Sequence, residues 1–433
     1  MDRQQIIEAA QRIEQVLDEE VVNTLGREVG YCQRLRLITP GRLALALLSA
    51  LGGQAVSCIA DLLRSFNALL GTQVAYKPFH NRLAKRQFPD FMRAIAERAW
   101  RLWVVKVLGA EPEQCLGEFQ RVVLQDGTSF AVKDTLRHVW PGRFYTVKPA
   151  AVELHTTLEL LSGSPLKVTL TPDTAAERAQ QPPPERLTGC LYMGDRGYLE
   201  KRYLGQVESA GGTFLVRAPQ SINPKVLAIH TPDGRDLSAL CDQPLKRIRY
   251  HLPRDVPVDL DVEWKDGKQR HRWRLVLTWS QHHGQYLHLV TNLPRERYDA
   301  ATVRQIYRLR WQVELLFKEW KSHANLHAFN TANPYLAEGL MWAALAAATL
   351  KRYLAHAAQR ATGVETSTLR AAMSGPHLVP PLIRALRQGF DTLIQAVEKV
   401  LRYLAANAQR AHPARDRRKG RSQIGILPQC STA

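Results

Sequence analysis

The apolar pattern of the chain changes near Phe119 and changes again near Asp299. Before the first point, apolar residues recur at helical spacing, as at Ile6, Ala10 and Ile13. Between the two points, the apolar runs are short, rich in β-branched residues and separated by turn signals, which is typical of strands. After the second point, helical spacing returns. This order predicts an α/β protein with helical regions on both sides of its core.

Two short apolar runs in the central part end at an aspartate that has a glycine beside it. Residues 121–125 lead into Asp126, and residues 190–193 lead into Asp195. A carboxylate at the end of a buried strand is held rigidly, and carboxylate oxygens are ligands that Mg²⁺ prefers. The alternative is an ordinary aspartate at a strand-to-turn junction, which is common. Residues 128–132 are expected to return as a second strand.

One long amphipathic helix is predicted to run from Asp299, a candidate N-cap, to about Lys321. At about 100° per residue, its apolar side chains form one stripe and its polar side chains form another directly beside it. The polar stripe consists of Tyr307, Arg310, Glu314, Lys318 and Lys321. A polar stripe at the edge of a core indicates a helix that borders a cleft. The alternative is a ladder of surface ion pairs, worth tenths of a kcal/mol each, which gives no role to Tyr307 or Lys321.

The chain is strongly basic. Its 433 residues contain 59 Lys and Arg against 40 Asp and Glu, which gives a formal net charge of +19 and a pI of about 9.9. A folded basic chain favours a polyanionic partner, most often nucleic acid; the alternative is charge that serves solubility alone. A hydrophobic content of 45% excludes wholesale disorder. No apolar run reaches the ~20 residues of a membrane span, and the six cysteines form no Cys-x-x-Cys pair. We therefore expect a cytoplasmic protein without membrane contact.

The N-terminal region resembles a helix-turn-helix. Two predicted helices and a short turn precede a third, basic helix near residues 79–85. Arg82, Lys85 and Arg86 are candidate DNA contacts there, and the alternative is a structural bundle with a solvated basic face. The tail from 402 to 421 carries seven Lys or Arg and one Asp. It is expected either to add nonspecific phosphate contacts or to be a solvated tail without a role.

Three motifs together resemble the DDE transposases of the insertion sequence 4 family. The spacing Tyr307-x2-Arg310-x3-Glu314-x6-Lys321 matches the Tyr-Arg-Glu-Lys signature of that family. The tripeptide that begins at Asp126 resembles its first aspartate motif, and the segment 194–198 around Asp195 resembles its second. The resemblance covers about residues 120–330.

The resemblance implies a ribonuclease H-like catalytic core with a mainly β insertion. The resulting prediction is a helical N-terminal domain that recognises DNA ends over residues 1–115, a core over 116–330 with the insertion at about 220–285, and a helical C-terminal region with a basic tail over 331–433.

In that family the three carboxylates, Asp126, Asp195 and Glu314, hold two Mg²⁺ ions, for which Mn²⁺ is expected to substitute, and they catalyse the reaction. The resemblance also implies that Tyr307, Arg310 and Lys321 contact DNA, with Lys318 as a further candidate. The implied activity is cut-and-paste DNA transposition: hydrolysis at the inverted-repeat ends, followed by transfer of the 3′-hydroxyl into target DNA.

The implied partners are double-stranded DNA and a second copy of the chain in a synaptic complex, in the nucleoid of a bacterial cytoplasm. Hairpin closure of the end would require a flipped base stacked on an aromatic ring, for which Trp264, Trp273 and Trp279 are candidates; the favoured alternative for each is a place in the core. Two alternatives stay open: a nuclease on the same core without strand transfer, and a non-catalytic DNA-binding derivative.

Overall fold

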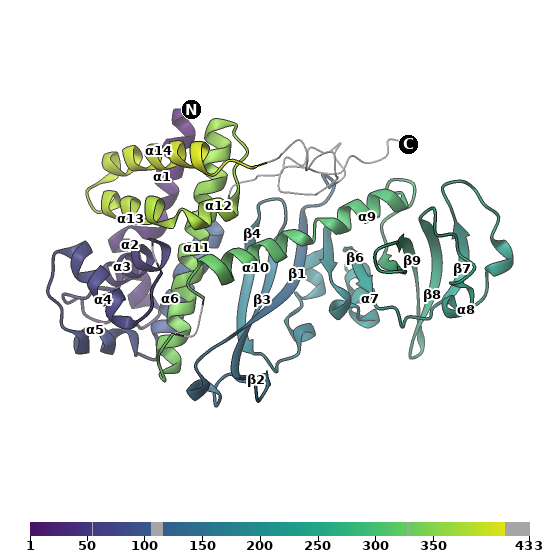
Figure 1. Ribbon diagram of the computed structural model, residues 1–433, viewed down its shortest axis with the longest axis horizontal. Coiled ribbons are helices and arrows are strands. Elements are labelled where there is room, and N and C mark those ends of the chain that lie inside the picture. Colours follow the sequence, from purple (N-terminus) through teal and green to yellow (C-terminus); the bar gives the residue numbers. More distant parts are fainter. Residues whose placement is uncertain (54, 105–115, 327–328, 412–433) are drawn as a thin grey trace.

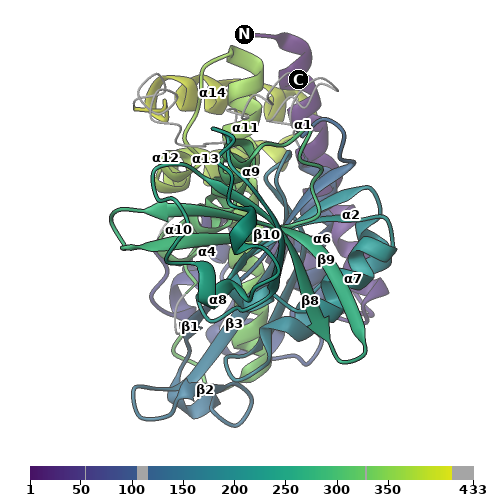
Figure 2. The ribbon, with the colours of Figure 1, turned by 90° about the vertical axis from the view of Figure 1, so that its right-hand side faces the viewer.

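The computed structural model describes residues 1–53, 55–104, 116–326 and 329–411. Figure 1 shows a helical body at one end, a twisted sheet in the centre and a β-rich extension at the other end. Figure 2 views the molecule from the β-rich end, with the strands in front of the helical body. Within the described ranges, no helix combines the length and hydrophobicity that a membrane span requires.

Ten strands of the described residues form one mixed sheet. Its centre is β1 (Arg121–Ala131), which is antiparallel to β3 (Lys148–Glu159) and parallel to β5 (Cys190–Gly194). On one side β3 also pairs with β4 (Ser164–Pro172), and on the other β5 is parallel to β6 (Thr213–Ala218). The sheet thus changes from antiparallel to parallel at β1, beside the strand that leads into Asp195.

The strand predicted at residues 121–125 is longer in the structure than its prediction. β1 continues without interruption through Asp126 to Ala131, so residues 128–132 do not return as a second strand. The reason is the partner strand, because β3 pairs with β1 along its length and places Asp126 opposite Thr156. β3 and β4 flank a tight turn, in which Gly163 has a positive φ of 62° that favours glycine.

The turn-rich stretch 220–285 forms the β-rich extension. It contains β7 (Lys225–His230), β8 (Val258–Asp266) and β9 (Gln269–Ser280), joined in antiparallel register. β10 (Gln285–Thr291) then pairs with both β9 and β6. The extension is therefore continuous with the central sheet through the β6–β10 pair.

The helices before and after the sheet pack against one another in one helical body (Figure 1). The long α11 (Pro334–Thr362) crosses α6 (Phe88–Leu102), and α14 (Phe390–Asn407) lies against α1 (Arg3–Leu17). The indole N–H of Trp100 donates a buried hydrogen bond of 2.9 Å to Thr349 Oγ1, which joins α6 to α11. The N-terminal members are α1 (Arg3–Leu17), α2 (Glu19–Glu28), α3 (Pro40–Gly53), α4 (Ile59–Leu70), α5 (Tyr76–Leu83) and α6 (Phe88–Leu102). The C-terminal members are α11 (Pro334–Thr362), α12 (Thr368–Met373), α13 (Gly375–Leu386) and α14 (Phe390–Asn407).

The remaining elements lie around the sheet. They are β2 (Pro141–Phe144), α7 (Lys201–Ser209), α8 (Leu245–Ile248), α9 (Ala300–Arg308), α10 (Trp311–His323) and the 3-10 turns at Asp134–Leu136, Glu177–Gln180, Pro184–Leu187, Arg196–Tyr198 and Ser238–Leu240. The predicted domain boundary at 115 and residues 412–421 of the predicted basic tail lie outside the described residues.

Candidate active site

Three carboxylates approach one another on one face of the sheet. Asp126 lies on β1, Asp195 directly follows the neighbouring β5, and Glu314 lies in the first turn of α10. Side chains alternate along a strand, so Asp126 is on the same face as Leu124, whose core also contains Val313 of α10. Burial is the main cause of the raised pKa of Asp126, and the negative charges of Asp195 and Glu314 add to it.

Arg310 joins two of these carboxylates. Its Nη1 donates to Asp126 Oδ2 at 2.9 Å, and its Nη2 donates to Glu314 Oε1 one turn further along the helix. The Arg310 side chain is only 13% exposed. Burial opposes its charge, but Tyr307 and the two carboxylates outweigh burial and raise the pKa of Arg310. The guanidinium is therefore an internal cation at the centre of the acidic site.

The site has the composition of a divalent-metal site. Burial, the largest contribution, raises the pKa of Asp126 to about 6, although Arg310 and the backbone N–H of Gly127 oppose the shift. Oδ1 of Asp195 is buried without a hydrogen-bond partner in the described part of the chain, and Arg217 Nη1 lies 4.0 Å from it. Three carboxylates, one with an unsatisfied buried oxygen, suit a hard cation. Among the described residues, no three His, Cys, Asp or Glu side chains lie close enough together to hold a metal, and Arg310 forms ion pairs with two of the three carboxylates.

The predicted long helix consists of two helices. Asp299 is the N-cap, as predicted, and accepts a hydrogen bond of 2.7 Å from the Thr302 N–H. Between α9 and α10, at Leu309 and Arg310, the backbone bonds tighten: the N–H groups of 309, 310, 312 and 313 each donate to the carbonyl three residues earlier. This 3-10 geometry winds the chain more tightly than an α-helix. The directions of the side chains across the junction therefore do not follow the single rotation of 100° per residue that the prediction used.

The residues of the predicted polar stripe differ in their exposure. Tyr307 is buried, its pKa is raised by that burial, and the Arg310 guanidinium lies 5.9 Å from its ring centroid. Lys318 and Lys321 are exposed further along α10. Partial burial and the positive charge of Lys148 lower the pKa of Lys321. One exposed aromatic was missed: Trp311, which follows Arg310 and is 54% exposed. Trp311 lies outside the polar stripe of the predicted helix.

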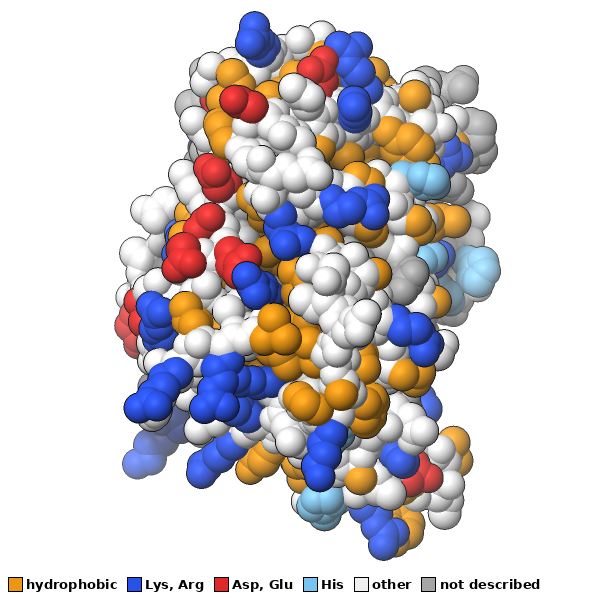
Figure 3. Space-filling view, turned by 90° about the vertical axis from the view of Figure 1, so that its left-hand side faces the viewer, with side chains coloured by type: hydrophobic (Ala, Val, Ile, Leu, Met, Phe, Trp, Pro, Cys, Tyr) orange, Lys and Arg blue, Asp and Glu red, His pale blue; other side chains and the backbone are white. Residues whose placement is uncertain are grey.

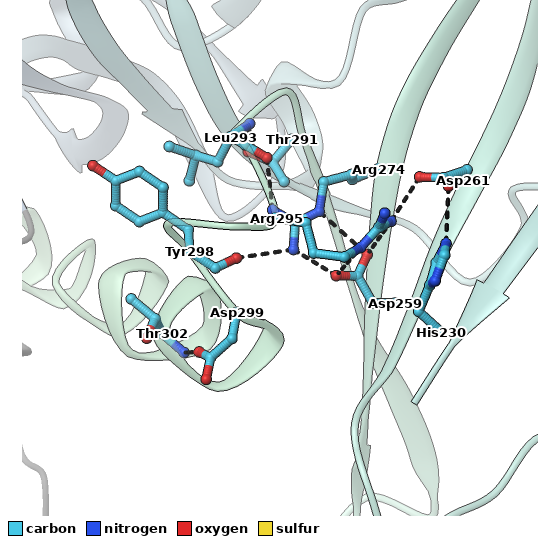
Figure 4. A network of polar contacts seen from close by, with 10 residues as sticks. All are labelled: His230, Asp259, Asp261, Arg274, Thr291, Leu293, Arg295, Tyr298, Asp299 and Thr302. Carbon is cyan, nitrogen blue, oxygen red and sulfur yellow. Dashed lines mark hydrogen bonds and ion pairs between the residues drawn. The ribbon is translucent and has the colours of Figure 1, made fainter. Parts of the chain in front are cut away.

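A buried ion-pair network fixes the start of α9 against the extension (Figure 4). Arg274 of β9 pairs with Asp259 of β8 through two hydrogen bonds of 3.2 and 2.5 Å. The same guanidinium donates to the carbonyls of Leu293 and Tyr298, in the segment that leads to α9. Arg295, from that segment, also donates to Asp259 at 3.0 Å. The network therefore ties two strands of the extension to the helix pair that carries Glu314.

A basic groove lies between α9 and the extension. It has a volume of about 910 Å³, and its lining includes Arg217, Arg254, Trp279, Arg304 and Arg308. Arg254 stacks over the Trp279 ring at 4.3 Å. Of the three tryptophans considered for base stacking, Trp264 and Trp273 are buried in the core and only Trp279 borders this groove.

The N-terminal candidates border a second hollow. Arg82 and Lys85 line a cavity of about 940 Å³ together with Arg34 and Arg36, which the sequence analysis did not single out. Lys85 donates to the Tyr31 carbonyl at 3.1 Å, so part of its role is structural, whereas Arg86 is exposed. Figure 3 shows this end of the molecule, with Lys and Arg side chains gathered on the lower part of the face.

Two further buried titratable groups lie on the opposite face of the sheet. Glu153 and His155 of β3 are both buried and pack against Gly127, where an added Cβ would lie 2.9 Å from Glu153 Oε1. Burial and the charge of Glu177 raise the pKa of Glu153 to about 7, and burial lowers the pKa of His155 to about 4. These groups explain why a glycine follows Asp126, and they do not belong to the carboxylate site.

The chain was compared with known proteins. The profile of the transposase DDE domain family matches residues 117–350. The transposase for insertion sequence element IS231C of Bacillus thuringiensis subsp. berliner is 22% identical over 349 residues, which cover 73% of each chain. The putative transposase InsL for insertion sequence element IS186A of Escherichia coli K12 is 39% identical over 84 residues, 19% of this chain and 23% of that one.

Among solved structures, a piggyBac transposase synaptic complex with hairpin DNA aligns with a TM-score of 0.47 and 10% identity, covering 94% of this chain and 86% of that one. The family match includes Asp126, Asp195 and Glu314 and more than half of the chain. The prediction of a transposase is thus confirmed at the level of the family, which implies dependence on a divalent metal. The chain belongs to the transposase DDE domain family and is a DDE-type transposase.

Proposed function

We propose that this transposase is of the insertion sequence 4 type and acts by cut and paste on its own inverted-repeat ends. The observation that carries the proposal is the convergence of Asp195 and Glu314 on Asp126, with Arg310 bonded to Asp126 and Glu314. The antiparallel β4–β3–β1 strands followed by parallel β5 and β6 support a ribonuclease H-like core. Tyr307, Arg310, Glu314 and Lys321 lie along α9 and α10 in the spacing of the family signature.

The three carboxylates are the ligands that we assign to two Mg²⁺ ions, with Mn²⁺ as a substitute. When bound, the metal pair supplies activation of the attacking oxygen and stabilisation of the leaving oxygen of a phosphodiester. The protein contributes rigid placement of the ligands: β1 and β5 hold the aspartates, and α10 holds Glu314 above them. Water is the first nucleophile, and the 3′-hydroxyl that it frees is the second, directed at target DNA.

Arg310 has a second role in this scheme. Its planar guanidinium matches a phosphate with two parallel hydrogen bonds, which a lysine does not provide. Because Nη1 and Nη2 already bond Asp126 and Glu314, a phosphate that binds these two nitrogens competes with the two carboxylates for Arg310. Lys318 and Lys321 extend the cationic surface along α10. Two DNA ends must be cut and joined together, so we propose a homodimer in the synaptic complex.

The basic groove beside α9 supports a path for DNA next to the carboxylates. Arg217, which lies 4.0 Å from Asp195, also lines the groove and so connects it to the site. Trp279 at its border is the tryptophan that we assign to base stacking. The N-terminal hollow with Arg82 and Lys85, together with the exposed Arg86, is the proposed reader of the inverted repeat.

The test is a cleavage and joining assay. Purified chain is incubated with Mg²⁺, a labelled duplex that carries its own flanking repeat, and a supercoiled plasmid. We expect cleavage at the repeat boundary and a joined product. Cleavage without joining would indicate a nuclease, and binding without cleavage in Mg²⁺ or Mn²⁺ would indicate a DNA-binding derivative.

The matched variants are Asp126→Asn, Asp195→Asn and Glu314→Gln, each expected to abolish cleavage while end binding persists. Glu153→Gln is the control, because Glu153 is a buried carboxylate on the opposite face of the same sheet. Normal cleavage by any of the three site variants would contradict the metal assignment.

A further inference from the structure

The hairpin formed by β2 and β3 carries an apolar tip that no other part of the described chain covers. Phe144, Tyr145 and Val147 are 62%, 70% and 78% exposed, although most large apolar side chains of the described residues are buried. Figures 1 and 2 both show the hairpin projecting from the lower edge of the molecule. Three adjacent exposed apolar side chains on a projecting element indicate a contact surface.

Backbone pairing and side-chain contacts hold the hairpin in a defined conformation. Phe144 pairs with Lys148 across it, and the Val147 N–H donates to the Phe144 carbonyl at 3.2 Å. Gly142 is required in it, because a Cβ there would lie 1.9 Å from the Lys148 carbonyl oxygen. Arg143 anchors its base by donating to the Asp173 carbonyl at 3.0 Å. The tip is therefore held outward by the fold.

The charges around the tip indicate which partner it contacts. Arg137, whose Nη1 is 3.5 Å from the Tyr145 hydroxyl, and Lys148 lie beside the aromatic rings, and both are exposed. Lys148 also acts on Lys321 electrostatically, so the hairpin continues the cationic stripe of α10. Cations that surround exposed aromatic side chains suit a nucleic acid, in which phosphates and base faces alternate.

We propose that Phe144, Tyr145 and Val147 form a wedge that contacts the bases of duplex DNA held at the active site. Apolar side chains inserted at a base step unstack it, while neighbouring cations bind the flanking phosphates.

Lys148 lies eight residues along β3 from Thr156, which is opposite Asp126. At about 3.4 Å per residue this separation is roughly 27 Å, or about eight base pairs of duplex. The wedge thus contacts DNA about eight base pairs from the reacting phosphate. The position of this contact rests on the proposed function.

The test variant replaces Phe144, Tyr145 and Val147 with Ala in the full-length chain. These side chains are exposed, so the fold is retained, and Arg137, Arg143 and Lys148 are unchanged. Met373→Ala, which removes an equally exposed apolar side chain from α12, is the matched control. Binding is measured on a duplex with the flanking repeat and on an unrelated duplex, and permanganate reactivity of thymines reports unstacked bases.

We expect roughly tenfold weaker binding of the repeat duplex by the triple variant, since stacking on an aromatic side chain contributes about that much per base. The dependence of binding on salt should be unchanged, because no cation is removed. Permanganate reactivity about eight base pairs from the cleavage position should disappear, and Met373→Ala should behave as the parent.

Unchanged affinity and reactivity in the triple variant, with normal cleavage by the parent, would overturn the wedge and leave the proposed function intact. Weaker binding by the triple variant, together with a parent that binds but does not cleave, would support the wedge and overturn the proposed function. A triple variant that becomes monomeric on gel filtration yet binds DNA with parental affinity would assign the tip to a second copy of the chain and overturn the wedge.

Discussion

Arg310 is the residue whose position adds most to the motif. The spacing of the signature identifies it as a phosphate contact, but only the structure shows that it pairs with Asp126 and Glu314. A cation that binds both carboxylates competes with a divalent metal for the same oxygens. Long-range contacts of this kind depend on the packing of α10 against β1, which local sequence does not specify.

Replacing Arg310 with Gln should lower the thermal stability of the metal-free protein, because two partly buried carboxylates then lack their shared cation. The stabilisation by saturating Mn²⁺ should increase, since a ligand stabilises more when it does not have to displace an internal competitor. Thermal unfolding with and without Mn²⁺ measures both effects. Arg402→Gln is the control, because Arg402 forms an exposed pair with Glu398 at the same i,i+4 spacing. Equal Mn²⁺ shifts in the parent and the Arg310→Gln variant would contradict the competition.

Glu153 gives a pH-dependent prediction. Its pKa in the folded protein is about 7, above the ordinary value of 4.5, so the folded state binds more protons between these values. Stability should therefore fall as the pH rises through this window. Glu153→Gln cannot ionise, and it should be more stable than the parent at pH 8 and equal to it below about pH 4.5. His155, whose pKa is lowered to about 4, acts in the opposite direction in both proteins. Thermal unfolding at several pH values tests this, and a constant difference would contradict it.

The sequence predicted the type of secondary structure better than the points at which the elements begin and end. The N-cap at Asp299 and the turn at Gly163 were predictable because their chemistry is local. β1 was predicted too short, because Gly127 reads as a turn while the pairing with β3 holds it in the strand. The 3-10 junction at Leu309 and Arg310 contains no proline or glycine, so the sequence did not indicate a break in the helix there.

The junction between the extension and α9 depends on Arg274. Replacing it with Met should destabilise the protein by about 1.5–3 kcal/mol, because the buried Asp259 loses two hydrogen bonds while it keeps those from Arg295. Arg270→Met is a matched control on the same strand, since the Arg270 side chain is 62% exposed and its pair with Glu263 should contribute less than about 1 kcal/mol. Urea denaturation of both variants measures the difference. Similar small losses in both would show that the network does not hold the helix pair in place.

The packing of the two helical regions into one body could not be predicted from the sequence. Each region shows helical spacing, but nothing local indicates that α6 crosses α11 or that Trp100 bonds Thr349. The consequence is that the N-terminal cations are fixed relative to the carboxylate site through α11 and the sheet. Arg352 of α11 shows the connection, because it donates to Glu319 of α10 and to the Gly163 carbonyl of the β3–β4 turn.

Such a rigid connection makes the salt dependence of DNA binding informative. If Arg82, Lys85, Arg86, Arg310, Lys318 and Lys321 each neutralise one phosphate of the same duplex, the slope of log K against log salt should be about −5. Arg82→Ala combined with Arg86→Ala should make the slope shallower by about 2, and so should Lys318→Ala combined with Lys321→Ala. If one duplex spans both surfaces, the four substitutions together should remove about 4. Fluorescence anisotropy at several salt concentrations measures the slopes. If Arg82→Ala combined with Arg86→Ala leaves the slope unchanged, the N-terminal hollow does not bind DNA. If the four substitutions together change the slope no more than either double substitution alone, the two surfaces bind separate duplexes.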